Sequence, residues 1–244
     1  MKLFWDALSE TNISYTINVI GSPPWNKSHS TNEILLENLI PGNLYIIQLS
    51  AYQGNKVLHG YGGQISVYTI PPVMSYLIID NVTTNSVSLS WPIPLGNISS
   101  YIIQVLGTPS NELRVYTNSS FVDQLIPGNY YTLMIFTTNG NMNGTKTQNT
   151  TFTVPSAITN LIIDRVTSTS VSLSWPIPLG NISFYIIQVS GTPSKQLTVN
   201  TNSSIVDQLI PGNYYTFTVF ATAGNINGIK TVNSTFTSKL NVKV

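Results

Sequence analysis

The chain has 244 residues, of which 42% are apolar and only 8% are charged, and its formal net charge is +1. An average soluble domain carries about 25% charged residues, so Ser, Thr and Asn must supply most of the polar surface here. The ten basic residues are scattered singly from Lys2 to Lys243 and cysteine is absent, which argues against nucleic acid as a partner and excludes a disulfide framework, a thiolate metal site and a cysteine nucleophile in this segment.

The residue types favour strands over helices. Val, Ile, Thr and Tyr suit strands and Asn and Ser suit turns, whereas the good helix formers Ala, Glu, Lys and Arg are scarce. No apolar run reaches the roughly 20 residues that span a bilayer, so we expect no membrane insertion by this segment. Its first ten residues contain Asp6 and Glu10 and lack the apolar stretch of a signal peptide, which predicts an internal fragment if the parent protein is secreted.

The first predicted unit begins with Trp5, which precedes Tyr15 by ten positions. Further along comes the run Leu-Ile-Pro-Gly-Asn-Leu-Tyr at residues 39–45. The unit ends in a proline-containing segment at residues 69–73, and a similar segment at residues 153–157 ends the second unit. Linkers this short that contain proline are semi-rigid.

The second and third units are near-copies of one another. The run SVSLSWPIPLGNIS at residues 86–99 returns unchanged at 170–183, and QLIPGNYYT at 124–132 returns at 208–216, so the period is 84 residues. This period is too long for one turn of a solenoid and matches a complete small domain. Each copy is therefore expected to fold around its own core.

Short alternating segments make up the third copy. Val171, Leu173 and Trp175 are expected to point to one side of a strand while the intervening serines point to the other. The segments at 185–189 and 215–221 repeat this alternation, with Gly and Pro turn signals between them. About seven strands per copy, with a turn every 8 to 12 residues, indicate a β-sandwich.

Three spaced features occur in all three copies: the tryptophan, the tyrosine ten positions later, and a Leu-x-Pro-Gly-x-x-Tyr motif before a strand. Together they resemble the fibronectin type III domain. The resemblance implies that Leu209, Pro211, Gly212 and Tyr215 form the family's tyrosine corner, in which the phenol hydroxyl bonds to backbone just upstream. An immunoglobulin domain is the nearest alternative, but it would need an inter-sheet cysteine pair.

We therefore expect an all-β chain of three tandem seven-stranded fibronectin type III β-sandwiches, at residues 1–71, 72–155 and 156–244, the first lacking its N-terminal strand. Residues 240–244 faintly echo residues 161–166, as though a further copy were starting. The expected structural core consists of Trp5, Tyr15, Leu39, Tyr45, Trp91, Tyr101, Leu125, Tyr131, Trp175, Tyr185, Leu209 and Tyr215.

Ten Asn-x-Ser/Thr sequons occur in the chain, and this motif accepts N-linked glycans in secreted proteins. A surface with so few charges has weak electrostatic protection against association, which hydrophilic sugars would supply. The alternative is that these are turn-forming asparagines in a bacterial or intracellular chain. The candidate glycosylation sites are Asn12, Asn26, Asn81, Asn97, Asn118, Asn143, Asn149, Asn181, Asn202 and Asn233.

Catalysis has little support in the sequence. His29 and His59 both fall in the first copy, whereas a site encoded by the repeat should recur in the others. Asp80 matches Asp164 one period later, and such repetition favours hydrogen bonding at a turn or strand end over an acid–base pair. We expect no catalytic residue, no metal ligand and no cofactor.

Two features could serve a protein ligand. The loops at residues 138–145 and 222–229 precede the last strand, where this architecture can display recognition residues, although each could be a plain hairpin. An exposed apolar patch for a partner or a neighbouring domain, or a set of isolated surface residues, is expected at Phe184, Ile186, Tyr214 and Phe220.

The amino-acid sequence of the repeats, SVSLSW followed by GNIS-(S/F)-YIIQV, resembles the ectodomain repeats of receptor-type protein tyrosine phosphatases. The resemblance implies an extracellular array, at the cell surface or secreted, that spaces or recognises proteins, carries N-linked glycans and leaves any phosphatase domain outside this segment. The alternatives are a secreted protein made only of such domains, linker domains of a secreted microbial carbohydrate-active enzyme, and part of an intracellular muscle-type scaffold.

Overall fold

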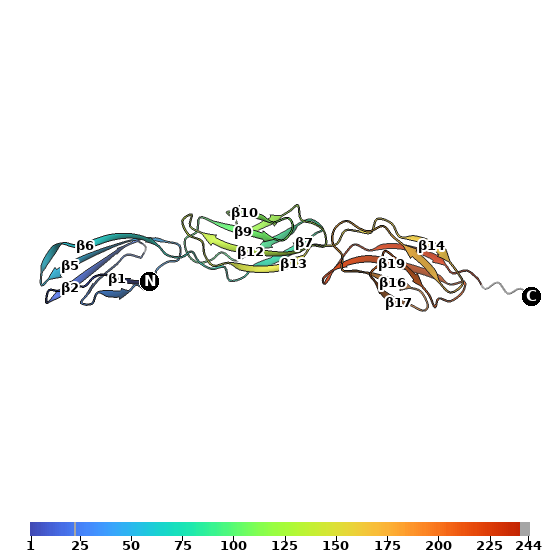
Figure 1. Ribbon diagram of the computed structural model, residues 1–244, viewed down its shortest axis with the longest axis horizontal. Coiled ribbons are helices and arrows are strands. Elements are labelled where there is room, and N and C mark those ends of the chain that lie inside the picture. Colours follow the sequence, from blue (N-terminus) through green and yellow to red (C-terminus); the bar gives the residue numbers. More distant parts are fainter. Residues whose placement is uncertain (22, 240–244) are drawn as a thin grey trace, which may run out of the picture.

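The computed structural model describes residues 1–21 and 23–239. These residues form strands and loops around three separate hydrophobic cores, which follow one another along the longest axis of the molecule (Figure 1). The prediction of an all-β fold is confirmed. Among the described residues no helix could span a lipid bilayer. The expected echo of a further copy at residues 240–244 lies outside the described residues.

The first sandwich has a two-stranded sheet, β1-β4, and a four-stranded sheet in the order β3-β2-β5-β6. All its neighbouring strands are antiparallel. Side chains from both sheets enclose a core that includes Tyr15, Ile34 and Tyr45. Its strands are β1 (Lys2–Phe4), β2 (Ile13–Ile20), β3 (Trp25–His29), β4 (Glu33–Leu35), β5 (Leu44–Gln53) and β6 (Lys56–Tyr68).

The second sandwich has a three-stranded sheet in the order β11-β8-β7 and a four-stranded sheet in the order β10-β9-β12-β13. It therefore has the seven strands that the sequence predicts. They are β7 (Ile78–Val82), β8 (Val87–Ser90), β9 (Ser100–Leu106), β10 (Asn111–Val115), β11 (Ser119–Val122), β12 (Tyr130–Thr138) and β13 (Thr147–Phe152).

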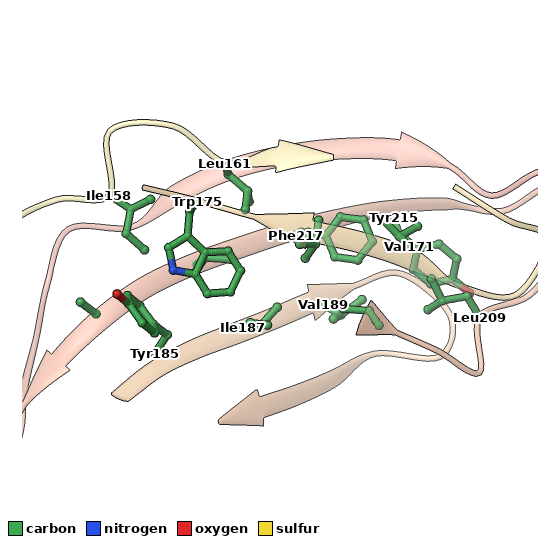
Figure 2. Packing of buried hydrophobic residues seen from close by; sticks show 14 residues of the cluster. Ile158, Leu161, Val171, Trp175, Tyr185, Ile187, Val189, Leu209, Tyr215 and Phe217 are labelled. Carbon is green, nitrogen blue, oxygen red and sulfur yellow. The ribbon is translucent and has the colours of Figure 1, made fainter. Parts of the chain in front are cut away.

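The third sandwich repeats this topology and adds a two-residue strand, β20, beside β19. Val171, Leu173 and Trp175 are buried while the alternating serines are partly exposed, because successive side chains of a strand point to opposite faces. Figure 2 shows the resulting core. The strands are β14 (Ile162–Val166), β15 (Val171–Ser174), β16 (Phe184–Ser190), β17 (Lys195–Val199), β18 (Ser203–Val206), β19 (Tyr214–Ala223), β20 (Ile226–Asn227) and β21 (Thr231–Phe236).

The first sandwich differs from the others at one edge. In the second sandwich β7 pairs with β8, and Met74 and Leu77 just before it are buried in the core. Within residues 1–21 and 23–239 no strand pairs with the corresponding edge of β1. An apolar groove lies there instead, lined by residues that include Leu3, Trp5 and Ile47. Trp5 is consequently only partly buried, as is Leu39.

Each core contains a tryptophan packed edge-on against the tyrosine ten positions later. The ring centroids of Trp175 and Tyr185 are 5.3 Å apart with an interplanar angle of 71°, an arrangement that places the positive ring edge over the negative face. The pairs in the first and second sandwiches are 5.2 Å and 5.4 Å apart. Burial raises the pKa of the Tyr185 hydroxyl above its ordinary value of 10.0, and the neighbouring Trp175 offsets part of this rise.

Asp80 and its repeat Asp164 lie within strands and not at strand ends, so the predicted position was wrong, although each makes the structural hydrogen bond that its repetition indicated. Asp80 and Asp164 are the extra residues of matching β-bulges, where the register shifts between residues 79 and 81 and between 163 and 165. A bulge re-aims a side chain along the strand. The Asp80 carboxylate thereby accepts a hydrogen bond from Ser90 Oγ, and Asp164 accepts one from Ser174 Oγ, both at 2.9 Å.

Candidate functional site

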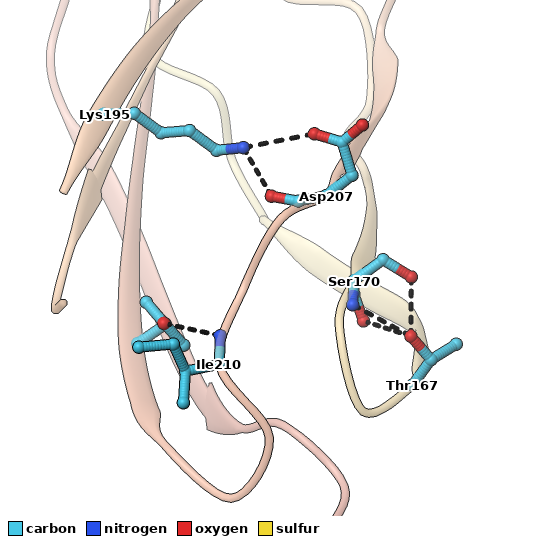
Figure 3. Close-up of polar contacts among 6 residues, drawn as sticks. Thr167, Ser170, Lys195, Asp207 and Ile210 are labelled. Atoms are coloured by element: carbon cyan, nitrogen blue, oxygen red, sulfur yellow. Dashed lines mark hydrogen bonds and ion pairs between the residues drawn. The ribbon is translucent and has the colours of Figure 1, made fainter. Parts of the chain in front are cut away.

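The Leu-x-Pro-Gly-x-x-Tyr motif folds into a braced corner at one end of each sandwich. In the third sandwich the backbone nitrogen of Ile210 donates to the hydroxyl oxygen of Tyr215 at 3.0 Å (Figure 3), and that hydroxyl donates to the carbonyl of Thr192. Thr237 donates to the carbonyl of Ile210 and accepts from the nitrogen of Asn213. The tyrosine bond recurs at 2.9 Å in the first and second sandwiches. The Pro-Gly-Asn turn inside the motif is therefore held in a defined shape.

The next sandwich docks on this corner. At the joint between the second and third sandwiches the backbone nitrogen of Asn181 donates to the carbonyl oxygen of Pro127 at 3.0 Å. The side-chain Nδ2 of Asn181 donates to Oδ1 of Asn129 at 2.8 Å. The Nδ2 of Asn129 donates to the carbonyl oxygen of Thr108 at 3.0 Å, and this bond orients the Asn129 amide so that its Oδ1 faces Asn181. One turn residue thus makes two bonds to the corner of the preceding sandwich.

The joint between the first and second sandwiches uses the same residue types. Asn97 donates from its backbone nitrogen to the carbonyl oxygen of Pro41 at 2.9 Å. Its Nδ2 donates to Oδ1 of Asn43 at 2.7 Å. Both joints therefore pair a Leu-Gly-Asn-Ile-Ser turn with a Pro-Gly-Asn corner, so the contact is encoded in the repeat.

The glycine of each corner is required by the joint. Gly42 and Gly128 have φ values of 73° and 65°, a left-handed conformation that glycine adopts without steric cost. A Cβ atom on Gly42 would lie 1.9 Å from the carbonyl oxygen of Asn97, and one on Gly128 would lie 1.7 Å from that of Asn181. Only a residue without a side chain lets the two backbones approach this closely.

The two predicted recognition loops, residues 138–145 and 222–229, lie at the joints. Asn139 Nδ2 donates to the carbonyl oxygen of Gly42 at 3.3 Å. Ala223 stands one period later, and there the neighbouring Gly224 lies against the ring of Phe152, since a Cβ on Gly224 would come within 2.4 Å of that ring. Both loops thus contact the preceding sandwich, one through a hydrogen bond and the other through an aromatic ring.

The corner of the third sandwich has the same form but a more open surface. Gly212 has a φ of 72°, close to the values at Gly42 and Gly128. Those two glycines are buried, whereas Gly212 is partly exposed. Among the described residues, a Cβ on Gly212 would meet only the side chain of Lys239, at 3.6 Å. The corner of the third sandwich therefore serves as a control for the other two corners, which the next sandwich covers.

The expected exposed apolar patch is wrong at Phe220. Phe220 is buried, opposite Ile186 on the neighbouring strand, and the Lys230 ammonium lies 5.4 Å from its ring centroid. Phe184 and Ile186 are partly buried. Of these four residues only Tyr214 is exposed, and its ring packs against the ring of Phe236 with centroids 4.9 Å apart. A long cationic side chain covers the outer face that the alternation assigned to solvent.

The six sequons that recur one period apart occupy three kinds of position. Asn97 and Asn181 lie at the joints, Asn118 and Asn202 in the turns before β11 and β18, and Asn149 and Asn233 within β13 and β21. The four sequons without a counterpart one period away are in exposed positions, at Asn12, Asn26, Asn81 and Asn143.

In the described part of the chain neither histidine belongs to a group of three or more His, Asp and Glu side chains that could hold a metal ion. His29 lies beside Thr31, with 2.7 Å between Nδ1 and Oγ1, and His59 lies in β6. Lys195 pairs with Asp207 at 3.2 Å on the surface (Figure 3). In the part of the chain that the structure describes, no three His, Asp or Glu residues come together in a way that could hold a metal ion.

Comparisons with known proteins agree with this architecture. The family model described as "Fibronectin type III domain" matches residues 71–153 and 156–237. A solved two-domain fibronectin type III segment from chicken tenascin covers 68% of this chain and 99% of its own, with a TM-score of 0.54 and 19% identity. That structural likeness concerns the fold.

Two curated relatives are receptor phosphatases. The chain is 29% identical over 236 residues to receptor-type tyrosine-protein phosphatase eta of Gallus gallus, covering 92% of this chain and 17% of the relative. It is 28% identical over 235 residues to receptor-type tyrosine-protein phosphatase H of Homo sapiens, covering 91% and 21%. The chain thus spans about a fifth of the length of these relatives.

Proposed function

The chain belongs to the fibronectin type III family, and from this premise we propose that it is a non-catalytic extracellular segment that spaces and presents binding domains of a cell-surface receptor or adhesion protein. The observation that carries this proposal is the repeated joint, in which Asn97 and Asn181 bond to the corner of the preceding sandwich. A joint with two hydrogen bonds and a short proline-containing linker limits bending. A spacer needs that property, because its length is useful only if its domains stay in line.

The domain boundaries belong to this proposal. We place them at residues 1–71, 72–155 and 156–244. The first boundary falls between Pro71 and Pro72, and the second directly follows Pro155. The family match at 71–153 and 156–237 supports the second and third of these. The separate core that includes Tyr15 and Tyr45 supports the first.

A finer attribution is an ectodomain segment of a receptor-type tyrosine phosphatase. The two receptor-type relatives support it, since each aligns over nine-tenths of this chain. In that case the catalytic domain lies outside the segment. A secreted protein made only of fibronectin type III domains and a set of linkers in a secreted microbial carbohydrate-active enzyme are the alternatives. The coding sequence on either side of the segment distinguishes the three.

Small-angle X-ray scattering of the full chain tests the spacer role. We expect a distance distribution with the long tail of a straight three-domain rod, as in Figure 1, and little change in the maximum dimension across salt concentrations, because the joints rely on neutral amide bonds and not on ion pairs. A compact particle, or a broad ensemble of bent shapes, would refute a stiff spacer. Treatment of protein from its native source with an N-glycosidase tests the extracellular assignment, which predicts a shift in mobility.

A further inference from the structure

N-linked glycosylation attaches a sugar to the side-chain nitrogen of a sequon asparagine and replaces one of the two hydrogens on Nδ2. Where Nδ2 already donates into the protein, the amide is turned toward that acceptor and the space around the nitrogen is restricted. Where the side chain is surrounded by solvent, a sugar meets no such restriction. The ten sequons of this chain divide into two groups by this criterion.

Asn233 and Asn149 connect the two sheets of their sandwiches. Asn233, half-buried in β21, donates from Nδ2 to the carbonyl oxygen of Leu161 at 2.7 Å and accepts at Oδ1 from the nitrogen of Ser234 at 2.8 Å. Leu161 is part of the buried core. Asn149 makes the matching bond to the carbonyl of Leu77 at 2.9 Å, and its Oδ1 also accepts from the following backbone nitrogen. Both ends of each amide are used within the fold.

Asn202 and Asn118 are bonded in both directions to the core tryptophans. The backbone nitrogen of Trp175 donates to the carbonyl of Asn202 at 3.0 Å, and Asn202 Nδ2 donates back to the carbonyl of Trp175 at 2.9 Å. Asn118 and Trp91 make the same pair at 3.1 Å and 3.4 Å. These bonds continue the pairing of β8 with β11 and of β15 with β18 by one residue beyond the strands. With Asn97 and Asn181 at the joints, all six asparagines in sequons that recur one period apart have an internal use for Nδ2.

The other four sequon asparagines behave differently. Within residues 1–21 and 23–239 the side chains of Asn12, Asn26, Asn81 and Asn143 make no hydrogen bond. All four are exposed, but so are four of the six paired asparagines, so the hydrogen bonds and not exposure separate the two groups. None of them has a sequon at the matching position of a sister copy. Arg165, for example, stands one period after Asn81.

We propose that N-linked glycans are attached at Asn12, Asn26, Asn81 and Asn143, and that the six paired asparagines remain unmodified because the fold and the joints use their amides. This inference rests on the proposed extracellular function. It accounts for the recurrence of three sequon pairs at the domain period by the hydrogen bonds that those asparagines make, and it leaves glycan attachment to the four single-copy positions.

The test is a site-by-site measurement of occupancy. The full chain is secreted from an N-glycosylating animal cell line behind a supplied leader, and peptide-N-glycosidase F in ¹⁸O water marks each occupied asparagine for mass spectrometry. We expect high occupancy at the four single-copy positions and little at the six paired positions. High occupancy of any paired position in the secreted protein, or a chain without glycans, would overturn the inference. Scattering from the same sample reports the rod shape independently, so failure of the spacer proposal is seen separately.

Variants of the protein made without glycans test whether the paired asparagines stabilise the fold through their side-chain amides. Asn233→Asp removes the donor to Leu161, whereas Thr235→Ala destroys the same sequon and keeps Asn233. We expect Asn233→Asp to move the unfolding of the third sandwich to lower urea, and Thr235→Ala and Asn143→Asp to leave the transitions of their sandwiches nearly in place. An Asn233→Asp chain as stable as the parent, or an equal loss in Asn143→Asp, would contradict the assignment.

Discussion

The side-chain nitrogen of Asn181 lies 2.8 Å from the side-chain oxygen of Asn129, across the joint between the second and third sandwiches. The two residues belong to units with separate cores, so their bond orients one rigid body against another. The backbone bond from Asn181 to Pro127 supplies a second point of attachment. Two points resist rotation about the linker as well as bending, which a single bond would not.

Gly128→Ala is expected to open this joint. The new Cβ would lie 1.7 Å from the carbonyl oxygen of Asn181, so the third sandwich must move away and both Asn181 bonds are lost. Small-angle scattering of the variant should show a wider range of shapes and a smaller mean end-to-end distance than the parent chain. A scattering profile identical to that of the parent would contradict the role of the joint.

Gly212→Ala is the control for the effect of backbone strain. Gly212 has the same left-handed backbone, with φ of 72° against 65° at Gly128, and an alanine in either place costs about 1 kcal/mol of conformational strain. A Cβ on Gly212 would lie 3.6 Å from the Lys239 side chain, which is an ordinary van der Waals contact. We therefore expect a similar small loss of stability but an unchanged scattering profile.

Trp175→Ala is expected to unfold the third sandwich and leave the second intact. Trp175 is 2% exposed at the centre of its core, and truncating a buried aromatic costs about 3–5 kcal/mol. Nuclear magnetic resonance spectra should lose the dispersed signals of the third sandwich and keep those of the second. Ile177→Ala, at a position that is 71% exposed, serves as the control and should change neither. Joint loss of both sets of signals would show that the two cores are not independent.

Tyr215→Phe separates the hydroxyl of the tyrosine corner from the packing of its ring. The variant leaves the backbone nitrogen of Ile210 without its acceptor, and an unsatisfied buried group costs about 1–3 kcal/mol. Urea unfolding should therefore show a lower midpoint for the third sandwich. Tyr214→Phe removes a hydroxyl that donates to Ser234 on the surface, so its effect should stay within about 0.5 kcal/mol.

Alkaline pH is expected to weaken the third sandwich through Tyr185. Burial raises the pKa of this hydroxyl in the folded state, while the unfolded chain has a tyrosine pKa of about 10. The stabilisation is therefore complete below about pH 10 and is lost as the pH rises through the higher folded-state value. Urea unfolding of the parent chain and of Tyr185→Phe on both sides of pH 10 measures this. A pH dependence that is the same in both proteins would show that Tyr185 is not responsible.

Much of the fold can be predicted from local pattern. The alternation at Val171, Leu173 and Trp175 specifies which side of the strand is buried, because strand geometry allows only two faces. The Leu-x-Pro-Gly-x-x-Tyr motif specifies the tyrosine corner because its defining bond, from the Ile210 nitrogen to the Tyr215 hydroxyl, joins residues five positions apart. The same two-face rule failed at Phe220, since it takes no account of Lys230, which comes from the segment just before β21 and covers the outer face.

The sequence by itself determined the all-β class, the 84-residue repeat and the residues that alternate toward each core, because these depend on neighbours along the chain. Only the tertiary structure decided that Asn97 and Asn181 are joint residues and that Asn149 and Asn233 link two sheets. The partners of these asparagines are 52 to 72 residues away. A sequon has the same three letters whether its amide faces solvent or a distant carbonyl, and that difference arises only when separate sheets and sandwiches pack against one another.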